Sequence, residues 1–168
     1  SGKEYVEVIK ENKNQHVADI LGLIIDELED KGLMTDKLYE EILNETSEAI
    51  TVWRKLEVPK IKSEEAYKSM MVLMDVCLKY GAYISGMLLA GMCIISTRDY
   101  AVYFPNAIFI TGKIAFELGY KEVAKNCFLF ADEGTNKKCW ENENDKKYEK
   151  LLLSVFRFSP FIITVRNL

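Results

Sequence analysis

The chain has 168 residues, of which 49% are hydrophobic, and this is enough apolar material for the core of one domain. Its 26 acidic and 22 basic residues give a net charge of −4, which disfavours nucleic-acid binding, because nucleic-acid-binding surfaces gather Lys and Arg. Only three prolines and nine glycines occur, so we expect a single all-α domain over residues 1–168.

The first section, residues 1–58, is predicted to form helices. Apolar residues recur at helical spacing over residues 17–31, and Gly32 follows as a predicted left-handed cap. Thr35 is the predicted N-cap of a second helix, which ends before Pro59.

The first of these helices carries a candidate acidic face. Residues 1–60 hold 14 acidic and 8 basic residues, a balance of −6, whereas the rest of the chain has a balance of +2. Such a concentration of negative charge could steer a basic partner, and the alternative is an ordinary solvated helix face. The candidate face consists of Asp19, Asp26, Glu27 and Asp30, together with Glu29.

The next section, residues 63–132, is predicted to form two helical hairpins. The residues that mark their boundaries are an N-cap, two helix-ending glycines and a first-turn proline, namely Ser63, Gly81, Gly119 and Pro105. The predicted helices cover residues 63–80, 83–96, 105–119 and 121–132.

The last section, residues 142–168, is predicted to contain a helix and an apolar tail. Residues 133–147 are almost all polar and are expected to form a loop. A final helix starts at Tyr148 and ends before Pro160. Residues 161–168 are apolar and β-branched, so we expect them to pack on the body of the protein or on a partner.

The four cysteines are not arranged as metal ligands. They form no CxxC pair, and His16 is the sole histidine, so we predict no metal site. Cys77, Cys93 and Cys127 lie in apolar runs and are expected to be core thiols. Cys139 lies in a polar segment beside two lysines, which would favour a reactive thiolate if the side chain is exposed.

We predict neither catalysis nor membrane insertion. The sequence has no recognisable nucleophile, zinc-protease or phosphate-binding motif, and so we expect no enzymatic activity and no cofactor. The longest apolar run, residues 84–95, is shorter than the roughly 20 residues that a membrane span needs. We therefore expect this run to be a core helix of a cytoplasmic protein.

The two hairpins have similar boundary residues, because a shift of 38 positions places Gly81 on Gly119. Residues from about 67 to 131 resemble the tetratricopeptide repeat, in which small residues allow two helices to pack closely. The resemblance is carried by Gly112, Ala124, Phe128 and Ala131, and the sequence departs from the repeat pattern at Ile108, Thr111 and Ala115. An irregular helical bundle that uses small residues for close packing is the alternative.

The resemblance implies a concave groove that is lined by the first helix of each hairpin and that holds a peptide or a partner protein. The groove positions would be Asn106, Phe109, Lys113, Phe116 and Glu117 in the second hairpin, and Lys68, Met71, Asp75, Leu78 and Lys79 in the first. Their apolar centres and charged edges favour an apolar peptide over a terminal carboxylate. The alternative is that these side chains are buried in the core.

The predicted function is therefore a non-catalytic protein-binding module of the adaptor or chaperone type, whose partner is another protein or peptide. Two alternatives stay open. One is an immunity or inhibitor protein that covers a basic toxin or nuclease with the acidic face. The other is a structural oligomerisation module that uses residues 84–95 or 161–168 as its contact. Salt separates the first two roles, because binding through an acidic face weakens steeply as salt is added.

Overall fold

The computed structural model describes residues 20–56, 63–97 and 104–136, together with residues 150, 151 and 155. Within these ranges the chain is helical and contains no strand, so the predicted all-α fold is confirmed. The helices are α2 (Ile20–Asp30), α3 (Asp36–Lys55), α4 (Glu64–Tyr80), α5 (Tyr83–Thr97), α6 (Phe104–Glu117) and α7 (Lys121–Asn136).

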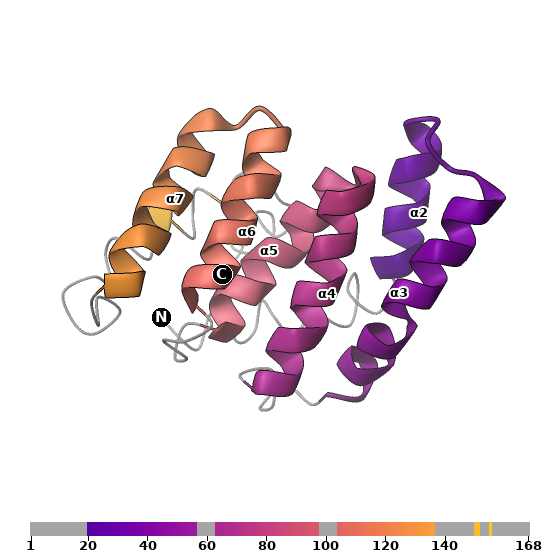
Figure 1. Ribbon diagram of the computed structural model, residues 1–168, viewed down its shortest axis with the longest axis horizontal. Coiled ribbons are helices and arrows are strands. Elements are labelled where there is room, and N and C mark those ends of the chain that lie inside the picture. The colour runs from indigo at the N-terminus through magenta and orange to yellow at the C-terminus, as the bar shows by residue number, and fades with distance from the viewer. Residues whose placement is uncertain (1–19, 57–62, 98–103, 137–149, 152–154, 156–168) are drawn as a thin grey trace, which may run out of the picture.

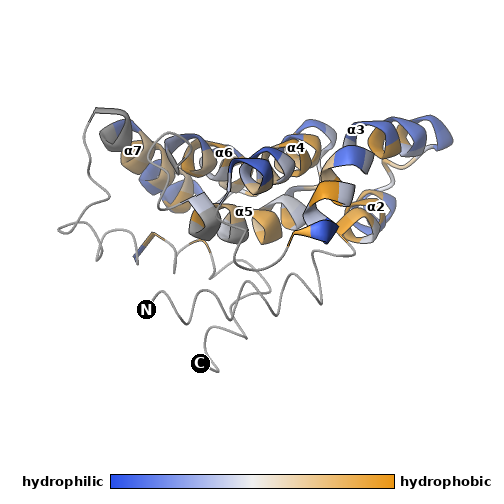
Figure 2. Ribbon diagram, turned by 90° about the horizontal axis from the view of Figure 1, so that it is seen from below, coloured by the Kyte–Doolittle hydropathy of each residue, from blue (hydrophilic) through white to orange (hydrophobic). Residues whose placement is uncertain are grey.

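The helices form two layers. Helices α3, α4, α6 and α7 lie side by side in one layer, and α2 and α5 lie beneath them in the other (Figures 1 and 2). Helix α5 packs against both α4 and α6, and α7 packs against α6. The hydrophobic faces of the helices are turned towards the space between the layers, which is where the core lies (Figure 2).

Several helices begin or end where local chemistry predicts. The Thr35 side chain caps α3, because its Oγ1 accepts a hydrogen bond of 3.1 Å from the backbone N–H of Leu38. Ser63 caps α4 in the same way, with a distance of 3.2 Å to the N–H of Ala66. The predicted helix-ending glycines all have positive φ, at 70° for Gly32, 94° for Gly81 and 82° for Gly119.

One predicted boundary is wrong. Helix α7 runs to Asn136, although its end was expected at residue 132 and a loop was expected from residue 133. The apolar pattern stops after Ala131. Residues 132–136 contain no proline, so every backbone N–H is still able to donate in the helix, and Gly134 weakens a helix by only about 1 kcal/mol. The helix therefore continues past the last core residue.

Several predicted features lie outside the described residues. These are the rest of the predicted loop, His16, Asp19, Cys139 and the apolar tail over residues 161–168. Of the predicted last helix, Leu151 and Val155 are helical and buried, so this part of the chain contributes to the core.

The core places three cysteines where the sequence predicts them. Cys77, Cys93 and Cys127 are buried as thiols. Burial raises the pKa of Cys93 and Cys127 to about 12, because it removes water from the charged form, and it raises the pKa of Cys77 further. These thiols therefore act as small apolar groups.

Helix α5 lies very close to its two neighbours in the upper layer. A Cβ atom at Gly86 would lie 3.1 Å from Cys77 Cβ of α4 and 3.1 Å from Ile114 Cδ1 of α6. Apart from Ile84, most of its apolar side chains that the structure describes are buried, as expected for a core helix. Among the described residues, no helix is both long enough and apolar enough to cross a membrane.

Candidate partner-binding surface

Helix α6 has apolar side chains on both of its faces. The face towards the core is buried and consists of Ala107, Ile108, Thr111, Ile114 and Ala115. The opposite face carries the predicted groove positions Asn106, Phe109, Lys113, Phe116 and Glu117, and all of them are exposed. Phe109 is 44% exposed and Phe116 is 57% exposed, so the alternative in which they are core residues does not hold.

The absence of a side chain at Gly112 brings a third aromatic ring onto this face. The ring of Phe128 on α7 lies over Gly112, where an added Cβ would be 2.7 Å from Phe128 Cε1. The Phe128 and Phe109 rings have centroids 5.4 Å apart and are tilted by 54°, within the usual range of aromatic pairs. Phe128 is half-buried, so it both packs the two helices and contributes to the surface.

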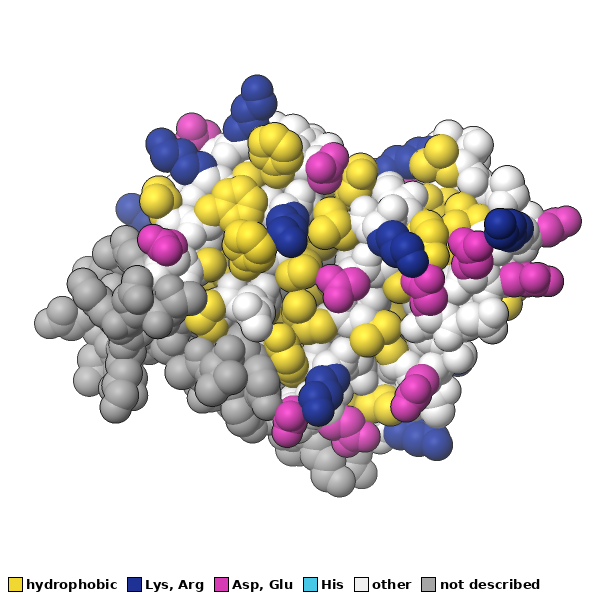
Figure 3. Space-filling model, in the orientation of Figure 1, with side chains coloured by type: hydrophobic (Ala, Val, Ile, Leu, Met, Phe, Trp, Pro, Cys, Tyr) yellow, Lys and Arg dark blue, Asp and Glu magenta, His cyan; other side chains and the backbone are white. Residues whose placement is uncertain are grey.

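We call Phe109, Lys113, Phe116 and Phe128 the α6 aromatic surface. Figure 3 shows apolar side chains gathered over α6 and α7 on this face of the molecule, with a basic side chain among them. Leu129 of α7 extends the exposed apolar area, with 54% of its surface accessible.

Two hollows meet at Phe128. The first has a volume of about 470 Å³ and is lined by Leu78, Tyr83, Lys113, Phe116, Glu117 and Phe128. The second has a volume of about 350 Å³ and is lined by Pro105, Asn106, Phe109, Phe128, Ala131 and Asp132. Because Phe128 lines both, the surface consists of two neighbouring depressions, one beside Phe116 and one beside Phe109.

Lys113 connects the aromatic surface with α4. Its Nζ atom lies 4.7 Å from the centroid of the Phe109 ring, a distance at which a cation is attracted to an aromatic face. Burial raises the pKa of Asp75 on α4 above its ordinary value, and the positive charge of Lys113 partly opposes this rise. The structure thus brings together two predicted groove residues from different hairpins.

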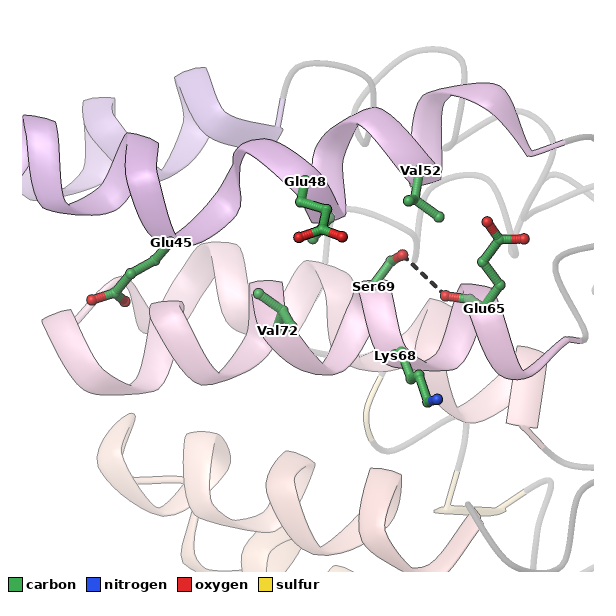
Figure 4. Close-up of a pocket in the computed structure, with 8 residues that line it drawn as sticks. Glu45, Glu48, Val52, Glu65, Lys68, Ser69 and Val72 are labelled. Atoms are coloured by element: carbon green, nitrogen blue, oxygen red, sulfur yellow. Dashed lines mark hydrogen bonds between the residues drawn. The ribbon is translucent and has the colours of Figure 1, made fainter.

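Other predicted groove positions on α4 lie elsewhere. Lys68 lines a separate hollow of about 410 Å³ between α3 and α4, which also includes Glu45, Glu48, Ala49, Val52, Glu65, Ser69 and Val72 (Figure 4). Lys68 forms an ion pair of 3.2 Å with Glu64, and Lys79 forms one of 2.9 Å with Glu45. Met71 is half-buried against the core. Lys68 thus lines a different hollow from the α6 residues, whereas Leu78 of α4 lines the hollow beside Phe116.

The predicted acidic face needs a correction at Glu27. Asp26, Glu29 and Asp30 are exposed, but the Glu27 side chain is only 9% exposed and points at the start of α5. Its carboxylate accepts hydrogen bonds from Ser85 N at 2.8 Å, Ser85 Oγ at 2.9 Å and Ile84 N at 3.0 Å. Glu27 therefore caps α5 from another helix.

The surroundings of Glu27 keep it ionised. Burial raises its pKa, but the hydrogen bonds from Lys31, Ser85 and Ile84 outweigh this effect, and the pKa lies below its ordinary value. Lys31 Nζ lies 2.8 Å from Glu27 and also donates a 2.7 Å hydrogen bond to the carbonyl of Gly81. Glu27 therefore connects α2 with the start of α5 and is not part of a binding face.

Several residues at the surface were not among the predicted site residues, among them Phe128, Tyr83 and Leu129. The sequence assigned Phe128 to packing alone, and Tyr83 and Leu129 were not considered. Leu129 could have been found from its position, since Cys127 and Phe130 on either side face the core. Tyr83 and Phe128 depend on how α5 and α7 approach α6, which the local sequence does not state.

Among the residues that the structure describes, no group of three His, Cys, Asp or Glu side chains is placed to hold a metal ion. Comparison with protein-family models matches no family, and comparison with curated proteins and with solved structures gives no match. The function of the α6 aromatic surface is therefore inferred from its own residues.

Proposed function

We propose that the protein is a non-catalytic binding module of the adaptor or chaperone type, which holds an apolar segment of a partner protein on the α6 aromatic surface. The observation that carries this proposal is the pair of exposed rings, Phe109 and Phe116, with a hollow beside each. Burying such a side chain stabilises a complex by about 1.5–3 kcal/mol. Contiguous exposed apolar patches of this kind are typical of interaction sites.

The arrangement suits a binding role in two further ways. The Phe109 and Phe128 rings pack against each other, and Phe128 also lies over Gly112, so these two rings lose little side-chain entropy when a partner binds. Lys113 lies among the rings with its ammonium group over Phe109, and Glu117 lines the hollow beside Phe116, so the apolar area also offers charged groups to the polar side chains of a partner. A reducing compartment such as the cytoplasm is compatible with the three buried thiols.

Capture of partners from native cell extract tests the proposal. The bait proteins are the wild type, the double variant Phe109→Ala/Phe116→Ala, and the control Tyr39→Ala, which removes an exposed ring on α3 that is 42% accessible. We expect the wild type and the control to retain the same partner at low and high salt, and the double variant to lose it. A partner that the double variant retains in full would contradict the proposal.

The acidic face of α2 supports the second candidate, an immunity or inhibitor protein for a basic partner. Asp26, Glu29 and Asp30 stay exposed after Glu27 is withdrawn into its bridge. Binding through these carboxylates would weaken steeply with salt and would be lost in the variant Asp26→Asn/Glu29→Gln/Asp30→Asn. The same capture experiment therefore distinguishes the two roles.

The third candidate, a structural oligomerisation module, is tested separately. Ile84 at the start of α5 is 55% exposed and is the part of the run over residues 84–95 that a second copy could contact. Light scattering over a range of concentrations measures the association. A mass that stays that of a monomer would remove this candidate.

A further inference from the structure

We infer that the partner segment is an amphipathic α-helix, with two apolar anchor residues seven positions apart and basic side chains beside them. This inference rests on the proposed function, because it names the kind of segment that would occupy the α6 aromatic surface. Three properties of the surface lead to it: the spacing of its two exposed rings, the size of its two hollows and the charge around them.

The spacing of the two rings, Phe109 and Phe116, matches a helix. Phe109 lines one hollow and Phe116 lines the other, and seven residues of α6 separate them by about 10.5 Å along the helix axis. A partner helix that lies along α6 presents residues i and i+7 on one face at the same separation. In an extended strand, side chains on one face lie about 6.6 or 13 Å apart, so neither spacing equals the separation of the two rings along α6.

The size of the hollows suits large apolar anchors. Their volumes of about 470 and 350 Å³ lie in the range of about 300–1,000 Å³ that is usual for ligand clefts. Each is lined on one side by an aromatic ring and shares Phe128 with the other. Leucine, methionine or phenylalanine anchors would therefore pack against rings on two sides.

The charges at the surface favour a basic partner. Glu117 and Lys113 line the hollow beside Phe116, and Asp75 of α4 interacts electrostatically with Lys113, so two carboxylates and one ammonium group give this hollow a balance of −1. The Asp75 carboxylate is partly desolvated, and a cation brought beside it would stabilise its charged form. Lysine or arginine residues that flank the apolar anchors would supply that cation and would also speed the encounter.

A second copy of the chain fits the surface less well. A two-fold axis through the middle of the α6 stripe would place Lys113 next to its own copy, and like charges at an interface centre are unfavourable. The carboxylates Asp75 and Glu117 would likewise face a surface with the same negative balance. A basic segment of another protein avoids both conflicts.

Selection from a display library of random peptides tests the inference. The peptides are roughly 16 residues long, about four turns if helical, and they are selected on the wild-type chain. Parallel selections use Phe109→Ala/Phe116→Ala and Asp75→Asn/Glu117→Gln. We expect the wild type to enrich pairs of apolar residues at i and i+7, together with Lys or Arg beside them. The charge-neutralised variant should keep the apolar pair and lose the basic preference.

Affinities of one selected peptide, measured by fluorescence anisotropy, complete the test. We expect binding to weaken by at least about 10-fold in the double Phe variant and by about 3–10-fold in the charge-neutralised variant. Enrichment at strand spacing, or a basic preference that the charge-neutralised variant keeps, would overturn the inference and leave the proposed function standing. Selection that is the same on the wild type and the double Phe variant would overturn the proposed function itself. A concentration-dependent dimer that the double Phe variant loses would overturn the inference in favour of a second copy.

Discussion

Gly112 of α6 lies directly beneath the aromatic ring of Phe128 of α7, so close that a Cβ at position 112 would come within 2.7 Å of the ring. The backbone of α6 is thereby in contact with a side chain of its neighbour. This contact both joins the two helices and places Phe128 between the two hollows.

The substitution Gly112→Ala should therefore affect stability and binding together. The added methyl group has to displace the Phe128 ring or the nearby Cys127 Cβ, which is 3.0 Å away, and such overpacking costs about 1–3 kcal/mol. Urea denaturation measures the free energy of unfolding. Gly22→Ala in α2 is the matched control, because a Cβ there meets nothing within 4 Å, and it should stabilise the helix by about 0.5–1 kcal/mol. Equal effects of the two substitutions would show that the close contact has no energetic role.

Removing the exposed rings should separate binding from folding. Phe116 is 57% exposed, so Phe116→Ala should change the free energy of unfolding by no more than about 0.5 kcal/mol while weakening partner binding. Ile108→Ala on the buried face of the same helix is the contrast, and it should cost about 2–5 kcal/mol. Thermal unfolding of both variants gives the comparison. A large loss of stability in Phe116→Ala would mean that the ring is a core residue.

The bridge from Glu27 to the start of α5 predicts a pH-dependent contribution to stability. Glu27→Gln should cost about 1–3 kcal/mol at neutral pH, because hydrogen bonds from Ser85, Ile84 and Lys31 lose their charged acceptor. The pKa of Glu27 in the folded state lies below its ordinary value of 4.5. Its contribution is therefore fully present above pH 4.5 and is lost as the pH falls through the folded-state pKa.

The difference between the wild type and Glu27→Gln should consequently shrink in acid. Glu29→Gln is the control, since this neighbouring carboxylate is exposed and its loss should change stability by less than about 0.5 kcal/mol. Urea denaturation at a series of pH values measures both. A difference that persists unchanged in acid would show that the charge of Glu27 does not stabilise the bridge.

Asp75 should show the opposite pH dependence. Burial raises the pKa of Asp75 above its ordinary value of 3.8, so the folded state resists ionisation more than the unfolded state does. The wild type should lose stability relative to Asp75→Asn as the pH rises from 3.8 through the raised folded-state pKa, and the two should converge in stronger acid. The substitution Lys113→Gln should enlarge the stability difference that depends on Asp75, because it removes the positive charge that favours the ionised form of the Asp75 carboxyl group. An unchanged difference would show that Lys113 does not act on Asp75.

Local features of the fold could be predicted from the sequence because their causes are local. The caps Thr35 and Ser63 bond to backbone groups three residues away. The glycines that end the helices adopt a positive φ, which a helix end requires at that position and which glycine adopts most easily. The exposed stripe of α6 follows from helical periodicity, which sets Phe109 and Phe116 on one face.

Features that depend on helices distant in the sequence could not be predicted in this way. Glu27 meets Ser85 across 58 positions, so nothing near Glu27 marks it as a cap. Lys68 faces a different hollow from Lys113, because α3 shares a layer with α4. The extra turn of α7 was missed for another reason, since the core pattern ends before the helix does.

The close approach of α5 at Gly86 has a consequence for specificity. Gly86 is buried and touches α4 through Cys77 and α6 through Ile114, so it sets how far apart these two helices stand. Leu78 and Phe116, which line the same hollow, belong to those two helices. A larger residue at position 86 would push α4 and α6 apart and so widen the hollow that Leu78 and Phe116 line. Selectivity for one partner over another could therefore change through a residue that no partner ever touches.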